Sequence, residues 1–96
     1  MDQSTIIDKK FNYSCVQIKR LREKPNDFEL LSLYGYYKQA INGDNNTSKP
    51  SFLQIKDKKK WAAWESTKGM SCNDAKINYY NTVNKLIAKY GIRAND

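Results

Sequence analysis

The chain has 96 residues, of which 40% are hydrophobic, and its 17 Lys and Arg against 10 Asp and Glu give a formal net charge of +7. This length predicts one domain, residues 1–96, with a single small core, and no apolar run approaches the roughly 20 residues of a membrane-spanning helix. The excess of lysine favours an anionic partner, which is a nucleic acid, an anionic membrane or a phosphorylated small molecule. With two cysteines and no histidine, the sequence predicts neither a disulfide framework nor an ordinary zinc site.

Apolar residues at helical spacing predict a first helix that ends before Pro25. Four of them step along the chain by four, three and three residues, which places them on one helical face: Phe11, Cys15, Ile18 and Leu21. A residue before proline is pushed out of the helical region, so we expect the helix to end within residues 22–25. On this stripe we interpret Cys15 as a small core residue and not as a reactive thiol.

A second helix is predicted between a capping box and a glycine. Asn26 or Asp27 is suited to cap its start, and Glu29 completes a capping box with Asn26. Gly43 supplies the left-handed stop. Its apolar stripe consists of Leu30, Tyr34, Tyr37 and Ile41. Lys38 shares a face with two of these tyrosines, and the sequence leaves open whether that face turns to the core or to a ligand.

Residues 43–56 form a long polar connection with several turn-forming residues. A loop of this length in a compact domain is usually functional or disordered. We expect this one to be ordered, because three apolar side chains are available to pin it: Phe52, Leu53 and Ile55.

A short third helix is predicted from Asp57 to Lys68, with Gly69 as its stop. Trp61 and Trp64 lie three residues apart on it. If the segment is helical from its start, two lysines four residues apart, Lys56 and Lys60, face the same way. We expect the lysines between them, Lys58 and Lys59, to point elsewhere.

The fourth helix carries the clearest signals. Ser71 is suited to cap it, with Asp74 at the third position, and Met70 is expected to staple onto Ala75. Gly91 ends it. Its buried side is predicted to hold Tyr79, Tyr80, Val83, Leu86, Ile87 and Tyr90. We expect the core to form where this helix packs against the first, which predicts an all-α fold of four helices.

Several motifs of the chain match those of a known family. Residues 34–40 read Tyr-Gly-Tyr-Tyr-Lys-Gln-Ala, residues 60–64 read Lys-Trp-Ala-Ala-Trp, and residues 89–92 read Lys-Tyr-Gly-Ile. Between them stand Gly43-Asp44, Asn46-Thr47, Pro50 and Lys68-Gly69. Over residues 9–92, without a gap, the chain resembles the acyl-CoA-binding protein family.

The resemblance implies a fold and a function. The fold is a four-helix bundle in up-down-down-up order, with a long crossover between the second and third helices. The function is tight, reversible binding of long-chain acyl-CoA thioesters by a monomeric carrier, which buffers an intracellular acyl-CoA pool for fatty acid metabolism. It implies no cofactor and no bond made or broken.

The resemblance also implies the residues of a site. Family members hold the 3′-phosphate of the nucleotide with positions that match Tyr34, Lys38 and Lys60. The position that matches Tyr37 packs on the adenine. Three further positions match Tyr79, which would line the head-group site, and Lys19 and Lys56. The acyl groove matches Ser14, Cys15, Leu30 and Leu31. These residue types suit the ligand, because lysines neutralise phosphates and a tyrosine offers both a ring and a hydroxyl.

Three other functional classes are possible for a small basic helical protein: a nucleic-acid-binding protein, a peripheral membrane protein and an enzyme. Nucleic-acid binding is disfavoured, because lysine dominates over arginine, the usual reader of guanine, and no helix-turn-helix spacing is evident. Standing membrane attachment is disfavoured because the helices are patterned for a core, whereas transient contact during ligand delivery fits. An enzyme lacks visible machinery, since no Ser or Cys stands beside a base. Residues 1–5 lack the pattern of a secretory signal, so we expect a cytoplasmic protein.

Overall fold

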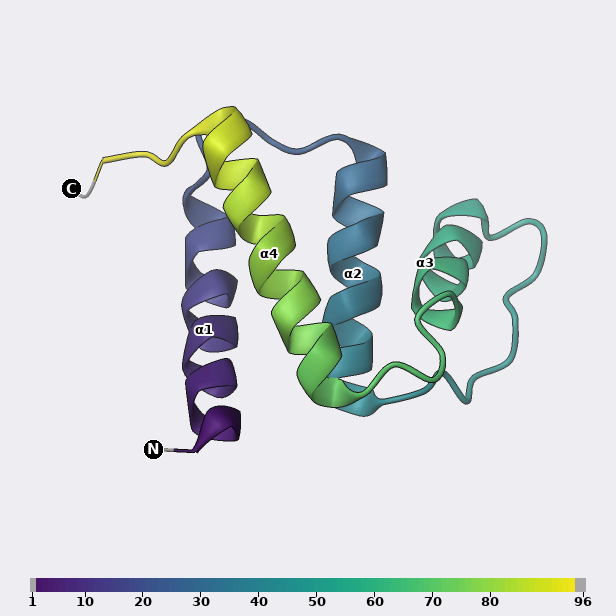
Figure 1. Cartoon of the computed structure of the whole chain (residues 1–96). Helices are drawn as coiled ribbons and strands as arrows, with labels where there is room; N and C mark the ends of the chain where they lie inside the picture. The colour runs from purple at the N-terminus through teal and green to yellow at the C-terminus, as the bar shows by residue number, and fades with distance from the viewer. Residues whose placement is uncertain (1, 95–96) are drawn as a thin grey trace.

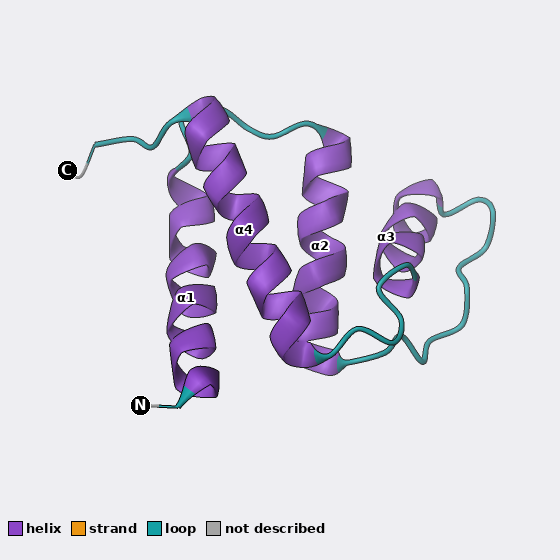
Figure 2. Cartoon of the chain, viewed as in Figure 1, coloured by secondary structure: helices purple, strands orange, loops and turns teal. Residues whose placement is uncertain are grey.

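The computed structural model describes residues 2–94, and four α-helices account for most of them (Figures 1 and 2). The helices are α1 (Gln3–Gln17), α2 (Asp27–Asn42), α3 (Ile55–Glu65) and α4 (Cys72–Tyr90), with a single 3-10 turn, η1 (Ile18–Arg20), after α1. Along the chain they run up, down, down and up, and the long connection from α2 to α3 crosses over outside the bundle (Figure 1). The predicted all-α fold and its helix order are confirmed.

The first helix ends earlier than predicted. Its α-helical part stops at Gln17, and after η1 the backbone straightens at Leu21 (φ −60°, ψ 141°). There Leu21 forms an isolated antiparallel bridge with Ile92, and the Arg22 amide donates to the Gly91 carbonyl at 3.0 Å. The C-terminal segment thus captures the backbone four residues before Pro25, and the proline itself does not set the end.

The other helix ends follow their local signals. Asn26 and Glu29 form the predicted capping box, with side chain to backbone distances of 2.8 and 2.9 Å. The Ser71 hydroxyl accepts the Asp74 amide at 3.0 Å. Gly43 and Gly91 both have φ near +78° where α2 and α4 end, a backbone conformation that residues other than glycine rarely adopt.

The core lies where α1, α2 and α4 meet. The predicted stripe of α1 is present, with Phe11 and Leu21 buried, and Cys15 and Ile18 packed against them in part. On α4 the buried residues are Ala75, Tyr79, Val83 and Leu86, while Tyr80, Ile87 and Tyr90 are half-buried. The prediction of a core from α1 and α4 alone is incomplete, because α2 packs against α4 and contributes Leu33 and Ala40.

Helix α3 stands outside this core and packs mainly against α2 (Figure 1). It begins at Ile55, two residues before the predicted start, and ends at Glu65. The expectation that apolar residues pin the crossover is wrong, since Phe52, Leu53 and Ile55 are all more than 60% exposed. Hydrogen bonds hold the crossover instead: the indoles of Trp61 and Trp64 donate to the carbonyls of Thr47 and Gly43.

A buried glutamine ties α2 to both ends of the α3 region. The Gln39 side chain is 1% exposed, and its amide donates to the Asp44 carboxylate and to the Met70 carbonyl, both at 2.8 Å. Its oxygen accepts the Thr67 hydroxyl at 3.0 Å. The Gly69 amide also donates to Asp44, and these bonds lower the pKa of that carboxyl group. Helix propensity alone gives no hint of this network.

Glu29 links the start of α2 to the end of α4. Its carboxylate accepts Lys89 Nζ at 2.8 Å and the Tyr90 hydroxyl, in addition to the Asn26 amide of the capping box. Lys89 and Tyr90, followed by the Asn26 amide, lower the pKa of Glu29 from 4.5 to about 2. The hydrogen bond with Glu29, followed by the one with Tyr90, raises the pKa of Lys89.

Candidate ligand-binding site

Tyr34 of α2 and Lys60 of α3 meet across the gap between the two helices. Lys60 Nζ lies 5.3 Å from the centroid of the Tyr34 ring, within the range of a cation–π contact. Both residues line a cavity of about 610 Å³, here called the Tyr34 cavity. Its other lining residues are Asp27, Leu30, Leu31, Ile55, Lys56 and Lys59. Four residues expected at the site from α2 and α3, in addition to Lys60, are therefore brought together: Leu30, Leu31, Tyr34 and Lys56.

The close approach of α2 and α3 depends on a glycine. A Cβ atom at Gly35 would lie 2.5 Å from the Ala63 carbonyl oxygen and 3.0 Å from its carbon, closer than such atoms pack. Gly35 is buried, so the backbone of α3 rests directly on that of α2 at this point. The neighbouring residue is Tyr34, and the contact sets its distance from Lys60.

One prediction about α3 is wrong. Lys59, expected to point away from Lys56 and Lys60, lines the same cavity. The helical spacing holds the reason: Lys59 is three residues beyond Lys56, and residues three apart share a face as do residues four apart. Asp27, Ile55 and Gly35 were also missed. Ile55 stands four residues before Lys59, so the same spacing identifies it once the start of α3 is known.

A second group of predicted residues gathers where α2 faces α1 and α4. The rings of Tyr37 and Tyr79 each lie near Phe11, at 6.0 and 5.2 Å between centroids, and 6.0 Å from each other. Tyr79 is 6% exposed and Tyr37 is 41% exposed, so Tyr37 covers this cluster and presents its ring to solvent. The sequence left open whether the face of α2 with these tyrosines turns to the core or to a ligand. In the structure Tyr37 packs toward α1 and α4, and Tyr34 faces α3.

Burial raises the pKa values of two neighbouring groups of this cluster, the Cys15 thiol and the Tyr79 hydroxyl. It raises the pKa of the Cys15 thiol, which the hydrogen bond with Tyr79 and the charge of Lys19 only partly offset. It also raises the pKa of Tyr79, and the proximity of Cys15 acts in the same direction. At neutral pH both groups are therefore protonated, and Cys15 is a thiol and not a nucleophilic thiolate.

The remaining predicted residues occupy separate positions. Lys38 Nζ lies 4.7 Å from a ring centroid of Trp64, one turn along α2 from Tyr34. Lys19 is exposed on η1, and it lies near enough to Cys15 for its charge to act on the pKa of the thiol. Ser14 is fully buried, and its hydroxyl donates to the Lys10 carbonyl at 2.9 Å. Its O–H donor is therefore already used within α1.

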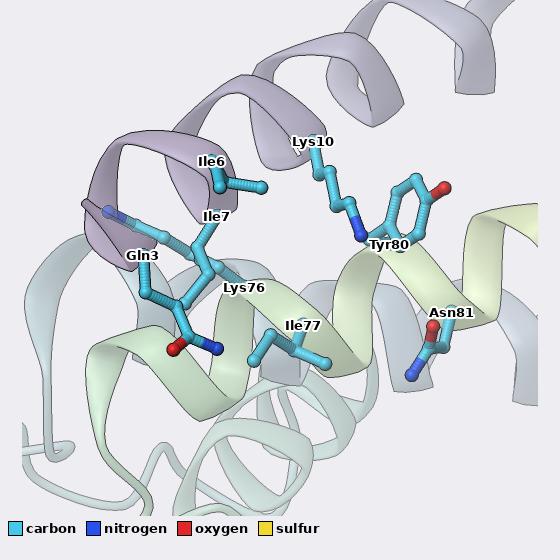
Figure 3. Close-up of a pocket in the computed structure, with 8 residues that line it drawn as sticks. All are labelled: Gln3, Ile6, Ile7, Lys10, Lys76, Ile77, Tyr80 and Asn81. Carbon is cyan, nitrogen blue, oxygen red and sulfur yellow. The ribbon is translucent and has the colours of Figure 1, made fainter. Parts of the chain in front are cut away.

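Two further cavities lie elsewhere. The Tyr36 cavity, about 660 Å³, opens on the other side of the α2–α3 contact and is lined by residues that include Tyr36, Ala62 and Met70. The Ile7 cavity, about 440 Å³, lies between the first two turns of α1 and the second and third turns of α4 (Figure 3). Neither Tyr34 nor any lysine predicted at the site lines either of them.

One of the two lysines of the Ile7 cavity is held in an ion pair, and the other makes a cation–π contact like that of Lys60 in the Tyr34 cavity. Lys76 forms an ion pair with Asp8 at 2.6 Å, and Lys10 extends toward the Tyr80 ring, 5.2 Å from its centroid (Figure 3). The Tyr34 cavity, by contrast, combines a leucine-lined wall with three lysines at its rim. This combination favours an anionic ligand with an apolar part. Within residues 2–94, no helix is long and apolar enough to cross a membrane, and no cluster of three or more potential metal ligands of the His, Cys, Asp or Glu type is found.

Comparison with known proteins gives one consistent result. A family model described as "Acyl CoA binding protein" matches residues 8–83. The acyl-CoA-binding protein homolog of Drosophila melanogaster is 42% identical over 85 residues, which are 88% of this chain and 99% of that protein. Acyl-CoA-binding protein 2 of Saccharomyces pastorianus is 45% identical over 85 residues, 88% of this chain and 98% of that protein.

The fold agrees with the sequence matches. The crystal structure of acyl-CoA-binding protein 2 from Oryza sativa superimposes with a TM-score of 0.86 at 31% sequence identity, and the match covers 90% of this chain and 94% of that one.

Proposed function

Because this chain belongs to the acyl-CoA-binding protein family, we propose that it binds long-chain acyl-CoA thioesters reversibly and carries and pools them for fatty acid metabolism. The observation that carries the proposal is the Tyr34 cavity, where two helices bring an aromatic ring, three lysines and an apolar wall together. An acyl-CoA has several phosphate charges at one end and an apolar tail at the other. A site for it needs this division.

We assign the nucleotide end of the ligand to residues of α2 and α3 beside the Tyr34 cavity. Lys38 and Lys60, from two helices, clamp the 3′-phosphate, and the Tyr34 hydroxyl adds a hydrogen bond. In the structure each lysine lies over an aromatic ring, so a phosphate replaces a weak cation–π contact with a charge-assisted hydrogen bond. Tyr37, whose ring is already exposed, supplies a stacking surface for the adenine.

The rest of the ligand lies between the two residue groups. Leu30 and Leu31 form the wall for the acyl chain, and Ser14 and Cys15 on α1 complete the acyl groove in this proposal. Tyr79 forms the base of the head-group site beneath Tyr37. The two outlying lysines, Lys19 and Lys56, make further contacts with the charged part of the ligand.

We assign the chain, residues 1–96, as one binding domain without catalysis, cofactor or metal. The raised pKa of Cys15 supports this assignment, because a protonated thiol with no base beside it is a poor nucleophile toward a thioester. Release of the unchanged ligand to an acyl-transferring or oxidising enzyme then completes the cycle.

The carrier acts as a cytoplasmic monomer that touches membranes only while it exchanges ligand. Phe52, Leu53 and Ile55 are exposed on the segment that leads into α3, and Ile55 also lines the Tyr34 cavity. Apolar side chains beside a lysine-rich rim suit brief contact with an anionic lipid surface. Nucleic acid is not a partner in this proposal.

Isothermal titration with palmitoyl-CoA, free CoA and palmitate tests the proposal. We expect tight one-to-one binding of the thioester, much weaker binding of CoA and no binding of palmitate. Absence of binding to every acyl-CoA overturns the proposal, and the lysine-rich surface is then to be titrated with nucleic acid.

A further inference from the structure

The Tyr34 cavity and the Tyr36 cavity lie on opposite sides of the α2–α3 contact, yet three residues line both of them: Asp27, Leu31 and Lys59. All three belong to the first two turns of their helices. The two cavities therefore adjoin each other at Leu31 and Lys59.

The helix contact explains why the two cavities adjoin at this end of the helices. The backbones of α2 and α3 touch at Gly35 and Ala63, and one turn further on the Thr67 hydroxyl donates to Gln39. The two helices run in the same direction (Figure 1), so their N-terminal turns lie beyond this closed contact. Leu31 is the α2 residue one turn before Gly35, at the point where direct backbone contact ends.

The lining of the Tyr36 cavity suits an apolar occupant. Phe28, 78% exposed, forms part of its wall, and Ala62, Ala63 and Met70 add apolar surface. The Ser66 hydroxyl already donates to the Ala63 carbonyl, and the single proton of the Thr67 hydroxyl is shared between the Trp64 carbonyl and the Gln39 side chain. They therefore have no proton left to offer a polar ligand, whereas an acyl chain needs none.

We propose that the Tyr36 cavity receives the distal end of acyl chains longer than palmitoyl, which enter it from the Tyr34 cavity between Leu31 and Lys59. The inference rests on the proposed function and extends it to a class of ligand, the very-long-chain acyl-CoA thioesters. The aliphatic stem of Lys59 covers the chain while its ammonium group stays in water. Phe28 loses its exposure to solvent when the chain is bound.

The size of the effect follows from burial of methylene groups. Each one removed from water contributes roughly fourfold in affinity. Partial burial of the extra carbons of a tetracosanoyl chain therefore predicts an affinity at least about tenfold higher than for palmitoyl-CoA. Without a second cavity, those carbons would stay in water and add little.

The test compares palmitoyl-CoA with tetracosanoyl-CoA, both below their micelle-forming concentrations, in calorimetric competition experiments. Ala62→Phe fills the Tyr36 cavity from an exposed position of α3, and Ala62 is not one of the residues that line the Tyr34 cavity. Ser66→Phe fills it from a second position. Ala88→Phe, at an exposed position of α4 that lines none of the three cavities, is the matched control.

We expect Ala62→Phe and Ser66→Phe to remove the gain of about tenfold for the longer chain and to change palmitoyl-CoA affinity by no more than about twofold. Ala88→Phe should change neither. The inference is overturned if the wild-type protein gains nothing from the longer chain, or if both filling variants keep the gain. Loss of palmitoyl-CoA binding by the wild-type protein would instead contradict the proposed function.

Discussion

Replacement of Gly35 by alanine tests the contact that brings Tyr34 and Lys60 together. Two effects oppose each other in this variant. In an ordinary helix interior, alanine is more favourable than glycine by about 1 kcal/mol. Here the new Cβ would lie 2.5 Å from the Ala63 carbonyl oxygen, a backbone atom that cannot rotate away.

The clash should outweigh the gain in helix propensity. Overpacking of a close contact costs about 1–3 kcal/mol, and a contact to backbone belongs in the upper half of that range. We therefore expect Gly35→Ala to lower the free energy of unfolding by about 1–2 kcal/mol. Because α3 must move off α2, Lys60 moves away from Tyr34, and affinity for palmitoyl-CoA should fall as well.

The structure provides a selective readout. Both tryptophans, Trp61 and Trp64, lie on α3, so their fluorescence in urea reports the docking of this helix, while far-UV circular dichroism reports all four helices. Ala88→Gly, at an exposed position of α4, measures helix propensity alone and should cost about 1 kcal/mol. The reasoning is refuted if Gly35→Ala is as stable as the wild-type protein, or more stable, and binds palmitoyl-CoA unchanged.

Three further predictions concern the site, the α2–α4 link and the buried amide. Lys60→Ala should weaken palmitoyl-CoA binding by about 1.5–3 kcal/mol, the value of a charge-assisted hydrogen bond, whereas Lys58→Ala, on the same helix but outside every cavity described, should leave it unchanged in calorimetry. The pKa of Glu29 is lowered from 4.5 to about 2 in the folded protein, so its contribution to stability is complete above pH 4.5 and is lost as the pH falls toward 2; Glu29→Gln should flatten this part of the stability curve measured by urea unfolding. Gln39→Leu should cost about 2–4 kcal/mol in the same assay, because it leaves buried polar partners without a hydrogen bond.

Each of these has a result that would contradict it. Equal losses in the two lysine variants would show that Lys60 acts only through net charge. An unchanged acid dependence in Glu29→Gln would mean that the bond to Lys89 does not persist in solution. A Gln39→Leu protein as stable as the wild-type one would mean that its partners find water.

Local signals in the sequence predict most helix ends of this protein. The capping box of Asn26 and Glu29, the cap at Ser71 and the stops at Gly43 and Gly91 each involve residues within one turn, so their chemistry is readable without a fold. The end of α1 is not readable in this way, because Ile92 captures Leu21 from 71 positions away. The same holds for the crossover, which is fixed by two indoles from α3.

The site was predictable where it follows helical spacing and where the family resemblance names its residues. Tyr34, Lys56 and Lys60 lie together as the spacing requires once α3 faces α2. The role of Gly35 was not predictable, because its meaning depends on a backbone atom of another helix. From the sequence, a lone glycine in a helix indicates a cost in helix propensity and a possible close packing contact, but it does not identify the partner of that contact.

The most direct test of the proposed function is to map where the ligand binds. We suggest following backbone amide chemical shifts during titration with palmitoyl-CoA. The account predicts that the largest changes lie on the facing turns of α2 and α3 around Tyr34 and Lys60, with a second group at Tyr37 and Tyr79. Changes centred instead on the Ile7 cavity, at Lys10 and Tyr80, would contradict it.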